Sequence, residues 1–500
     1  MRIGWIDGHL RSENHTVGTF GSPPPCRLRL VQLLAILVVA ANAPAATYYV
    51  AKNGNNSNPG TQAQPWLTIQ KAADTLVAGD TVYIKAGTYK EVVTPQDSGA
   101  PNQYITYAAY GNDLVVLDGE NVRPTGDPRW GGLFQIFNHS YIKVQKLRAV
   151  NSAYAGFLAE TTWDLSHHLV FENNSTSGTW SSGISVWRCA NVVIDGNDIR
   201  RACQGDGDLQ ECLTVSNTDT FEIKNNHVYD RPVGVVGGGG EGICSKDANR
   251  NGKIYGNHVH DMALLGLYVD AWGSHEDGIE VYNNIVHDAL EGISITDEIN
   301  TGSLTNVRVF NNIVYNNRVN GIVISDNTDG LPTGDGPKQN IWIVNNTVFH
   351  NGYGTPGWGG GITVVTKNPA SSNLVVRNNI CSQNQAWQIL RSRVIEARTT
   401  VEYNLLDGAN DYADADDRAT SGTSFRSGSP RFVNAAAYDF RLQAASPAID
   451  AGSPTAAPTT DYTGAARPKD GDGNGLAAFD IGAYEYQRAA TAARFWELFE

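Results

Sequence analysis

The segment from Gly240 to Asn257, GEGICSKDANRNGKIYGN, brings a glutamate, a lysine and an aspartate close together in the chain. These residues are Glu241, Lys246 and Asp247. A lysine that has lost its proton is a general base, and carboxylates hold cations or act as acids and bases themselves. An isolated group of this kind is usually a surface salt bridge. The neighbouring repeats decide between the two interpretations.

A short phrase of the form Gly-Ile-x-Val recurs along the chain. Its copies are SGISV (182–186), ECLTV (211–215), EGICS (241–245), LGLYV (265–269), EGISI (291–295), NGIVI (320–324) and GGITV (360–364). Strand alternation sends the apolar residues of each copy inward, so the residue four after the glycine points outward. Lys246 and Asp270 then share one outward column on consecutive copies, with Glu211 and Glu241 stacked where the strands begin. Carboxylates and a lysine on consecutive copies favour a functional site over separate salt bridges.

Between these phrases a second, Asn-containing phrase returns at irregular intervals of roughly 23 to 34 residues, as in a solenoid with variable loops. Its copies are ENNST (172–176), GNDI (196–199), NNHV (225–228), GNHV (256–259), NNIV (283–286), NNIV (311–314), NNTV (345–348) and NNIC (378–381). Each repeat therefore holds two or three short strands, whose apolar face is buried when repeats stack about 4.8 Å apart. Asparagine suits left-handed turn positions and amide ladders between coils. We predict an all-β, right-handed parallel β-helix.

The composition agrees with a turn-rich β protein, since glycine is abundant (52 residues) and only 18% of residues are charged. The net charge of −14 argues against nucleic acid as a partner, because phosphate binding needs a basic face. An acidic substrate would need a bridging cation or a local basic patch. We expect a polysaccharide as the partner and a monomeric protein.

Four parts are expected along the chain. Residues 1–46 are predicted to be a signal peptide with an upstream extension, because Arg27 and Arg29 precede an apolar run too short to span a membrane. Cleavage near Ala43–Ala46 would give a secreted or periplasmic protein with no membrane span. The β-helix is predicted over 47–410, with a short capping helix at 69–73, followed by a C-terminal module over 411–488 and a tail over 489–500.

Cysteines and histidines give weaker signals. Cys203 and Cys212 flank one loop and could close it with a disulfide in an oxidising compartment. The histidines at 258, 260, 287 and 350 follow the Asn phrases without a metal-binding spacing, and we interpret them as structural or solvated.

Several stretches resemble known β-helix enzymes. The opening, TYYVAKNGNNSNPGTQAQPWLTIQKAADTLVAGDTVYIKAGTYKE (47–91), is similar to that of many β-helix polysaccharide-active proteins, and residues 446–486 resemble a module common at the end of secreted bacterial β-helix proteins. The stretch from Glu211 to Asn257 resembles the catalytic coils of polysaccharide lyases of families six and nine. In the family-six pattern two glutamates begin adjacent strands and a lysine follows the second by five residues, as Glu211, Glu241 and Lys246 do here. Where family six next carries an arginine, this chain has Asp270.

The resemblance implies calcium-assisted β-elimination on an acidic, uronate-containing polysaccharide, with Lys246 as the base. Asp270 is the second catalytic candidate. The expected ligands of Ca²⁺ are Glu211, Glu241, Asp247 and Asp208. The expected substrate-binding residues are Trp187, Arg188, Tyr268 and Asp297.

Two alternatives stay open. The first is hydrolysis by paired carboxylates, Asp270 with Glu241, Asp247 or Asp297, at the spacing that one or two coil rises provide. The second is a β-helix that binds carbohydrate without cleaving it. The sequence does not distinguish pectate, alginate, another uronate polymer or a neutral glycan.

Overall fold

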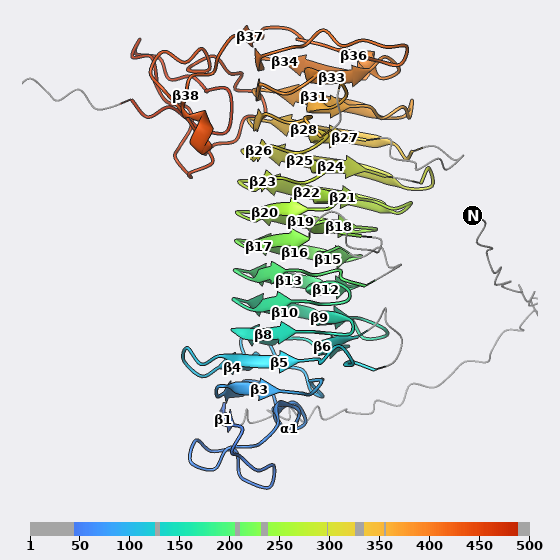
Figure 1. Cartoon of the computed structure of the whole chain (residues 1–500), viewed down its shortest axis with the longest axis vertical. Helices are drawn as coiled ribbons and strands as arrows, with labels where there is room; N and C mark the ends of the chain where they lie inside the picture. The colour runs from blue at the N-terminus through green and yellow to red at the C-terminus, as the bar shows by residue number, and fades with distance from the viewer. Residues whose placement is uncertain are drawn as a thin grey trace, which may run out of the picture. The chain divides into compact units, whose positions relative to one another are not determined.

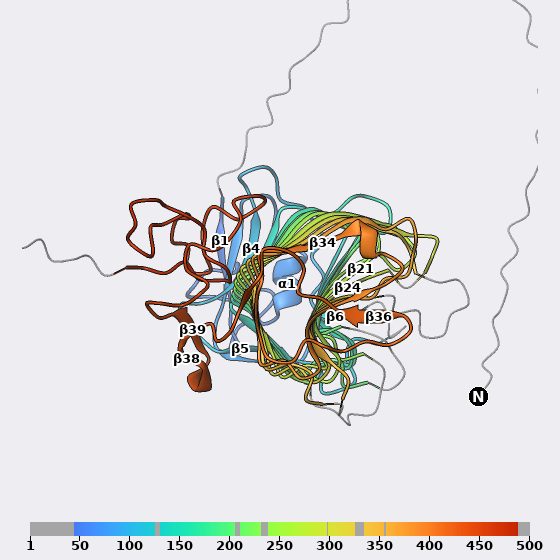
Figure 2. The ribbon, with the colours of Figure 1, turned by 90° about the horizontal axis from the view of Figure 1, so that it is seen from above.

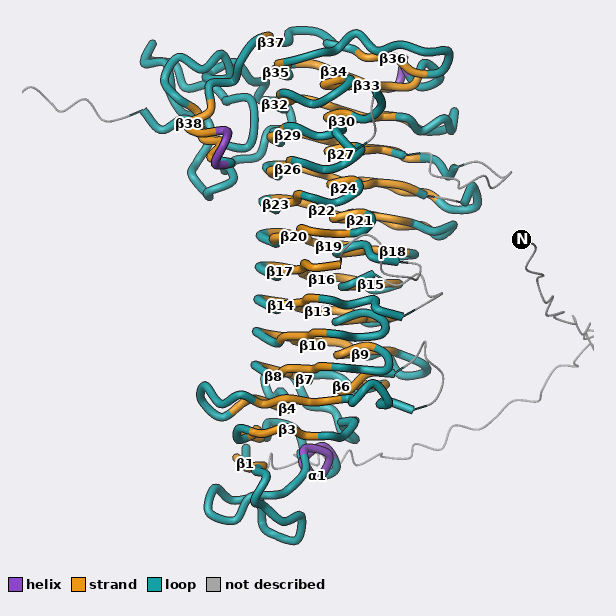
Figure 3. Tube along the Cα trace, in the orientation of Figure 1, coloured by secondary structure: helices purple, strands orange, loops and turns teal. Residues whose placement is uncertain are grey.

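A computed structural model describes residues 45–125, 131–205, 211–231, 239–297, 299–325, 335–354 and 357–488. Its main body is a stack of coils, most of which contribute one short strand to each of three largely parallel sheets (Figure 1). Strands make up the walls and loops the corners, with very little helix (Figure 3). Residues 1–44 of the expected signal peptide and the tail from residue 489 lie outside the described residues. No helix in the described part of the chain is long and apolar enough to cross a membrane.

Sheet A has 13 strands within the described residues, all paired in parallel. They are β1 (Thr47–Val50), β2 (Thr81–Ile84), β4 (Ile105–Ala109), β7 (Ile142–Gln145), β10 (His167–Glu172), β13 (Ala190–Asp195), β16 (Asp219–Lys224), β19 (Arg250–Tyr255), β22 (His275–Tyr282), β25 (Ser303–Phe310), β28 (Lys338–Val344), β31 (Ser372–Arg377) and β34 (Thr399–Glu402).

Sheet B also has 13 described strands, most of them very short. They are β3 (Gly87–Tyr89), β5 (Val115–Asp118), β8 (Leu147–Val150), β11 (Ser175–Ser177), β14 (Asp198–Arg200), β17 (His227–Arg231), β20 (His258–Met262), β23 (Ile285–His287), β26 (Ile313–Tyr315), β29 (Thr347–Phe349), β32 (Ile380–Ser382), β35 (Leu405–Asp407) and β37 (Arg426–Ser427).

Sheet C has 11 described strands and carries the Gly-Ile-x-Val phrases. Its last strand pairs antiparallel and the others pair in parallel. They are β6 (Gly132–Phe137), β9 (Ala155–Glu160), β12 (Ile184–Trp187), β15 (Leu213–Ser216), β18 (Ile243–Lys246), β21 (Leu265–Asp270), β24 (Glu291–Thr296), β27 (Asn320–Ile324), β30 (Gly360–Val364), β33 (Trp387–Ser392) and β36 (Asp417–Ala419).

The interior of the coils is one continuous apolar core. Inward positions of all three sheets are occupied mainly by Val, Ile and Leu that have no exposed surface, such as Ile243, Val259 and Ile279. The helix predicted near the start is α1 (Ile69–Ala73), which buries Ile69, Ala72 and Ala73 in this same core. Viewed along the stack, α1 lies within the outline of the coils (Figure 2). The apolar side chains of α1 are therefore part of the core of the coils.

The C-terminal segment packs on the outer face of sheet B. It contains the 3-10 helix η2 (Ala435–Ala437) and the antiparallel pair β38 (Phe432–Asn434) and β39 (Asp439–Leu442), while η1 (Glu396–Arg398) precedes β34. Phe432 and Phe440 share a second apolar cluster with Ile313 and Phe349 of sheet B. The last described strands of sheets B and C, β37 and β36, lie beyond residue 410, so the coil sheets extend into the segment assigned to the C-terminal module.

A buried ladder of asparagine side chains joins the coils. In each pair of neighbours the carboxamide oxygen of one asparagine accepts the main-chain N–H of the asparagine one coil earlier, as Asn284 does from Asn257 at 3.0 Å. Its Nδ2 donates to the main-chain oxygen of Ile254 and to the side chain of Asn312. The ladder runs through Asn174, Asn197, Asn226, Asn257, Asn284, Asn312, Asn346, Asn379 and Asn404.

The five cysteines of the described residues are free thiols and all are buried. Burial, together with a hydrogen bond to Cys212, raises the pKa of the Cys203 thiol well above its ordinary value. The disulfide considered from the sequence is thus absent from the described structure, although the two thiols are neighbours.

We predict that Asn284→Ala lowers the free energy of unfolding by about 3 kcal/mol, because it leaves the buried N–H of Asn257 and the carbonyl of Ile254 without partners. Chemical denaturation measures the change. The control is Asn53→Ala at an exposed position, for which we expect a change within about 0.5 kcal/mol. Equal stability of the two variants would contradict a stabilising role of the ladder.

Candidate active site

The outward column predicted on sheet C is present. Ser216, Lys246, Asp270 and Thr296 are partners on the adjacent strands β15, β18, β21 and β24, and Trp187 of β12 continues the row. Ile243 and its equivalents fill the core, so alternation directs Lys246 to the outer face. The register prediction for Lys246 and Asp270 is therefore confirmed.

An ion pair joins the two residues that the resemblance placed at the centre of the chemistry. The ammonium of Lys246 lies 2.8 Å from Oε1 of Glu211, and the side chains are 17% and 5% exposed. Thr214 donates to Oε2 of Glu211 at 2.7 Å, so both carboxylate oxygens have partners. The pair is therefore largely shielded from solvent and held in one geometry.

The electrostatics of this pair set the charge of the lysine. Burial alone would lower the pKa of Lys246, but the negative charge of Glu211, helped by Cys244 and Asp270, outweighs burial and raises the pKa well above its ordinary value. The side chain is therefore an ammonium ion near neutral pH while the pair is intact. The ammonium also lies 5.8 Å from the centre of the Trp272 ring, within cation–π distance.

A cleft of about 670 Å³ opens over this part of sheet C. It is acidic, with five carboxylates against two lysines, and has two tryptophans at its rim. Its lining includes Glu211, Glu241, Lys246, Tyr268, Asp270, Trp272, Glu291, Asn320, Trp358, Lys367 and Asp417. Of the residues predicted from the sequence, Lys246, Asp270, Tyr268, Glu211 and Glu241 are thus brought together.

Asp270 is almost completely buried beneath the cleft surface. Its Oδ1 accepts the main-chain N–H of Trp272 at 2.9 Å. This bond fixes the turn that follows β21, in which Trp272 has a positive φ of 41° and remains 43% exposed. Asp270 therefore positions an exposed aromatic ring beside Lys246. Such a ring presents the flat apolar surface on which a sugar can stack.

Glu291 begins β24 two coils beyond Glu241 and lines the same cleft. Burial raises the pKa of its carboxyl group, even though hydrogen bonds from Asn320 and Ser294 favour the charged form. Asn320 donates to Oε1 at 2.9 Å, and Asn320 in turn accepts from Thr363, which accepts from the buried Trp387. A carboxyl group with a raised pKa in a polar cleft suits a proton donor.

Three predicted substrate-binding residues do not line this cleft. Trp187 bonds to Ser185 through its ring N–H at 2.6 Å. Arg188 has turned away to form an ion pair with Glu160. Asp297 is buried and accepts the main-chain N–H of Gly273 at 2.9 Å, which makes it part of a turn. Arg188 and Asp297 follow the ends of β12 and β24, and alternation along a strand does not determine the direction of residues in the turn after it.

The expected calcium ligands do not converge in the described residues. Glu211 and Glu241 line the cleft, but Asp247 accepts hydrogen bonds from Ser216 and Asn217, and Asp208 lies outside the described residues. In the part of the chain that the structure describes, no three of these carboxylates approach within 4.8 Å of one another. Both oxygens of Glu211 are also engaged by protein groups. This arrangement would have to open before it fits Ca²⁺, which takes six to eight oxygen ligands.

The cleft contains groups that the sequence interpretation missed. Trp272 and Trp358 are the exposed rings at its rim, and Lys367 adds a second positive charge. Trp272 and Lys367 lie beyond the ends of β21 and β30, and Trp358 lies before β30, so strand alternation does not determine the direction of these side chains. The nearest signal was the aromatic residue two positions after Asp270 in DAWG.

Comparisons with known proteins agree on the fold. Residues 48–393 match the family model described as "Pel9A-like, right handed beta helix region". The uncharacterized protein YwoF of Bacillus subtilis (strain 168) is 27% identical over 446 residues, covering 80% of this chain and 91% of YwoF. Pectate lyase PEL9 of Emericella nidulans is 28% identical over 172 residues, covering 32% of this chain and 41% of that protein.

Two solved structures extend the comparison. The crystal structure of pectate lyase Pel9A has a TM-score of 0.51 at 16% identity and covers 89% of this chain and 97% of its own. The complex of XylC with xylose has a TM-score of 0.52 at 13% identity and covers 88% of this chain and 98% of its own. At these identities the likeness shows the fold. The prediction of a right-handed parallel β-helix is confirmed.

We predict that Glu211→Gln lowers the pKa of Lys246, because the largest raising influence is removed while burial, which lowers the pKa, remains. Selective ¹³C-methylation of lysines followed by NMR titration measures it. Asp247→Asn, a carboxylate that faces Ser216 instead, is the matched control and should change the Lys246 titration much less. An unchanged pKa in Glu211→Gln would contradict the ion pair.

Proposed function

This chain belongs to the Pel9A-like right-handed β-helix family, and we propose that it is a polysaccharide-acting enzyme whose active site is the cleft over sheet C. Two similar proteins, Pectate lyase PEL9 and Pel9A, bear the name of pectate lyases. The observation that carries the proposal is the shielded Lys246–Glu211 pair in a cleft rimmed by exposed tryptophans.

The leading chemistry is β-elimination on a uronate-containing chain. A base removes the proton at C5 of the uronate, the electron pair forms a C4–C5 double bond, and the glycosidic C4–O bond breaks with its electrons going to the departing oxygen, which is protonated. Lys246 is the proposed base because it is the lysine at the centre of the outward column. A bound Ca²⁺ would neutralise the charge of the substrate carboxylate and make the proton at C5 more acidic.

The Lys246–Glu211 pair imposes a condition on this role. As long as Glu211 holds the ammonium, Lys246 can bind a substrate carboxylate but cannot accept a proton. A substrate carboxylate or a cation that draws Glu211 away would remove the main influence that raises the lysine pKa, while burial continues to lower it. Catalysis by Lys246 therefore requires the pair to open.

Hydrolysis is the second candidate, and two features of the cleft favour it. Lys246 is charged in the described geometry, and Glu291 has the raised pKa expected of a general acid. Glu291 would protonate the leaving oxygen, while Asp270 or Glu241 would act as base or nucleophile. Lys246 would then bind the substrate.

The proposed site of action is outside the cytoplasm. It rests on the leader predicted over residues 1–46, in which an apolar run precedes the Ala43–Ala46 cleavage region. The monomeric state also remains a proposal.

We expect purified protein to generate an unsaturated, ultraviolet-absorbing product from a uronate polymer, and Lys246→Ala to lower its rate by about 10²–10⁴-fold, as for loss of a general base. A chelator tests the calcium requirement. The matched control is Lys253→Ala, an exposed lysine of sheet A, which should keep the wild-type rate.

If the protein forms new reducing ends without ultraviolet absorbance, and Asp270→Asn or Glu291→Gln abolishes their formation, the reaction is hydrolysis and not elimination. If no polymer of an acidic and neutral panel gives a product, the proposal of an enzyme is refuted, and the alternative of a carbohydrate-binding protein is retained.

We expect Trp272→Ala to raise KM about tenfold, corresponding to about 1.4 kcal/mol of lost binding, because the exposed ring beside Lys246 is the stacking surface nearest the proposed chemistry. Steady-state kinetics or binding to a non-cleaved oligosaccharide gives the value. Trp163→Ala, which removes an 80% exposed tryptophan that does not line the cleft, is the control. An equal effect of both substitutions would contradict the assignment.

A further inference from the structure

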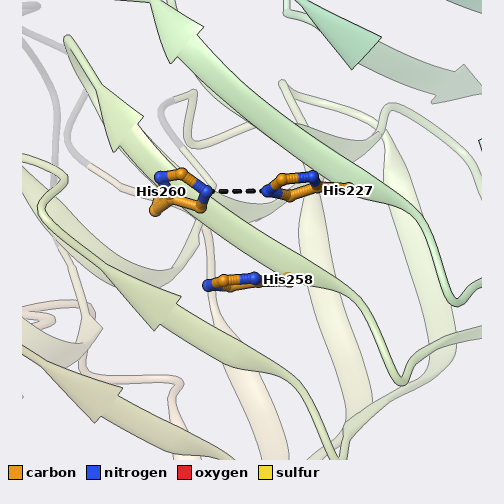
Figure 4. A group of neighbouring side chains, drawn as sticks. All are labelled: His227, His258 and His260. Atoms are coloured by element: carbon orange, nitrogen blue, oxygen red, sulfur yellow. Dashed lines mark hydrogen bonds between the residues drawn. The ribbon is translucent and has the colours of Figure 1, made fainter. Parts of the chain in front are cut away.

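A cluster of histidines lies on the outer face of sheet B. His227 begins β17, and His258 and His260 lie two residues apart on β20, so both point to the same side of the sheet. His227 is the strand partner of His258, and His260 is the partner of His287 on β23. Figure 4 shows His227 and His260 edge to edge, with His258 beside them.

The ring nitrogens of the cluster converge closely. Nε2 of His227 lies 2.7 Å from Nε2 of His260, and Nε2 of His258 lies 2.9 Å from Nε2 of His287. One nitrogen from each of His227, His258 and His260 lies within 4.8 Å of the other two. A tetrahedral zinc site with Zn–N distances of 2.0–2.1 Å separates its ligand nitrogens by about 3.3 Å. Side-chain adjustments below about 1.5 Å therefore bring the three to coordination distance.

Carboxylates orient the rings from behind. Nδ1 of His260 lies 2.7 Å from Asp261, and Nδ1 of His287 lies 2.6 Å from Asp288. Because a carboxylate accepts hydrogen bonds, the neutral form of each ring that fits this contact has its proton on Nδ1 and its lone pair on Nε2, which faces the cluster. When a metal displaces the Nε2 proton of His227, the proton can move to Nδ1 of the same ring. This Nδ1 lies 3.7 Å from a carboxylate oxygen of Asp198. A histidine that binds a metal through one ring nitrogen usually donates the N–H of the other to a carboxylate, a main-chain carbonyl or water.

From this geometry we propose that His227, His258 and His260 form a binding site for a divalent transition-metal ion of the Zn²⁺ type, with Asp261 orienting His260. Imidazole ligands favour Zn²⁺, Ni²⁺ and Cu²⁺ over Ca²⁺ and Mg²⁺. All three rings are partly exposed, which gives an ion a path of entry and leaves a fourth position for water or His287. The site lies on sheet B, whereas the proposed active site lies on sheet C, so it does not depend on the proposed function.

The test is titration of the full chain, free of any affinity tag and stripped with chelator, with Zn²⁺ by calorimetry and with Co²⁺ by visible absorption, in excess Ca²⁺ to occupy acidic sites. We expect one Zn²⁺ ion to bind per chain in the presence of excess Ca²⁺, and bound Co²⁺ to give the absorption spectrum of tetrahedral coordination. His260→Gln should weaken binding by roughly 100-fold or more, and Asp261→Asn, which keeps every ligand, by roughly 10–100-fold.

The matched control is His275→Gln, an exposed histidine of β22 that contacts Ser303 and should leave binding unchanged. Circular dichroism confirms that each variant is folded, and Asp261→Asn keeps the test valid should His260→Gln fail to fold. Absence of Zn²⁺ binding by the wild type, or equal affinity in His260→Gln and His275→Gln, would overturn the proposal and leave the cluster as packing between coils.

Discussion

The register between successive coils is the constraint on which the rest of the molecule depends. In a parallel solenoid, residues at equivalent positions lie one above another about 4.8 Å apart, so a shift of one coil by one residue would turn its apolar side chains outward. The buried asparagine ladder opposes such a shift, because each carboxamide satisfies main-chain groups of the neighbouring coils. Function follows from the same register, since each outward column collects side chains that are far apart in sequence.

Two columns illustrate this consequence. On sheet C the register places Lys246 beside Asp270, and Glu211, which precedes the neighbouring strand β15, forms an ion pair with the lysine. On sheet B it places His227 beside His258 and His260 beside His287. The first group combines opposite charges in a cleft on sheet C, whereas the second is a group of imidazole rings on sheet B. One architecture thus presents chemically different surfaces on different sheets.

Sequence patterns were sufficient for the fold and for part of the candidate site. The Gly-Ile-x-Val phrases determine which residues share a column, so the repeat spacing alone pairs Lys246 with Asp270. Residues in turns could not be placed, because their backbone does not alternate: Trp272 lies at the cleft rim, whereas Asp297 is buried in a turn. The proximity of the histidines was not predicted from the sequence, for a related reason. Their contacts join neighbouring coils 29 and 33 residues apart, and a motif search along the chain does not detect such spacings.

The central claim is that the cleft over sheet C, with Lys246 at its centre, binds and cleaves a polysaccharide. The most direct test is a crystal structure of the inactive Lys246→Ala variant with an oligosaccharide of the polymer that the wild-type protein acts on. We expect sugar units across β18 and β21, with one ring stacked on Trp272 and the bond to be cleaved next to position 246. Sugar bound on another face, with this cleft empty, would contradict the claim.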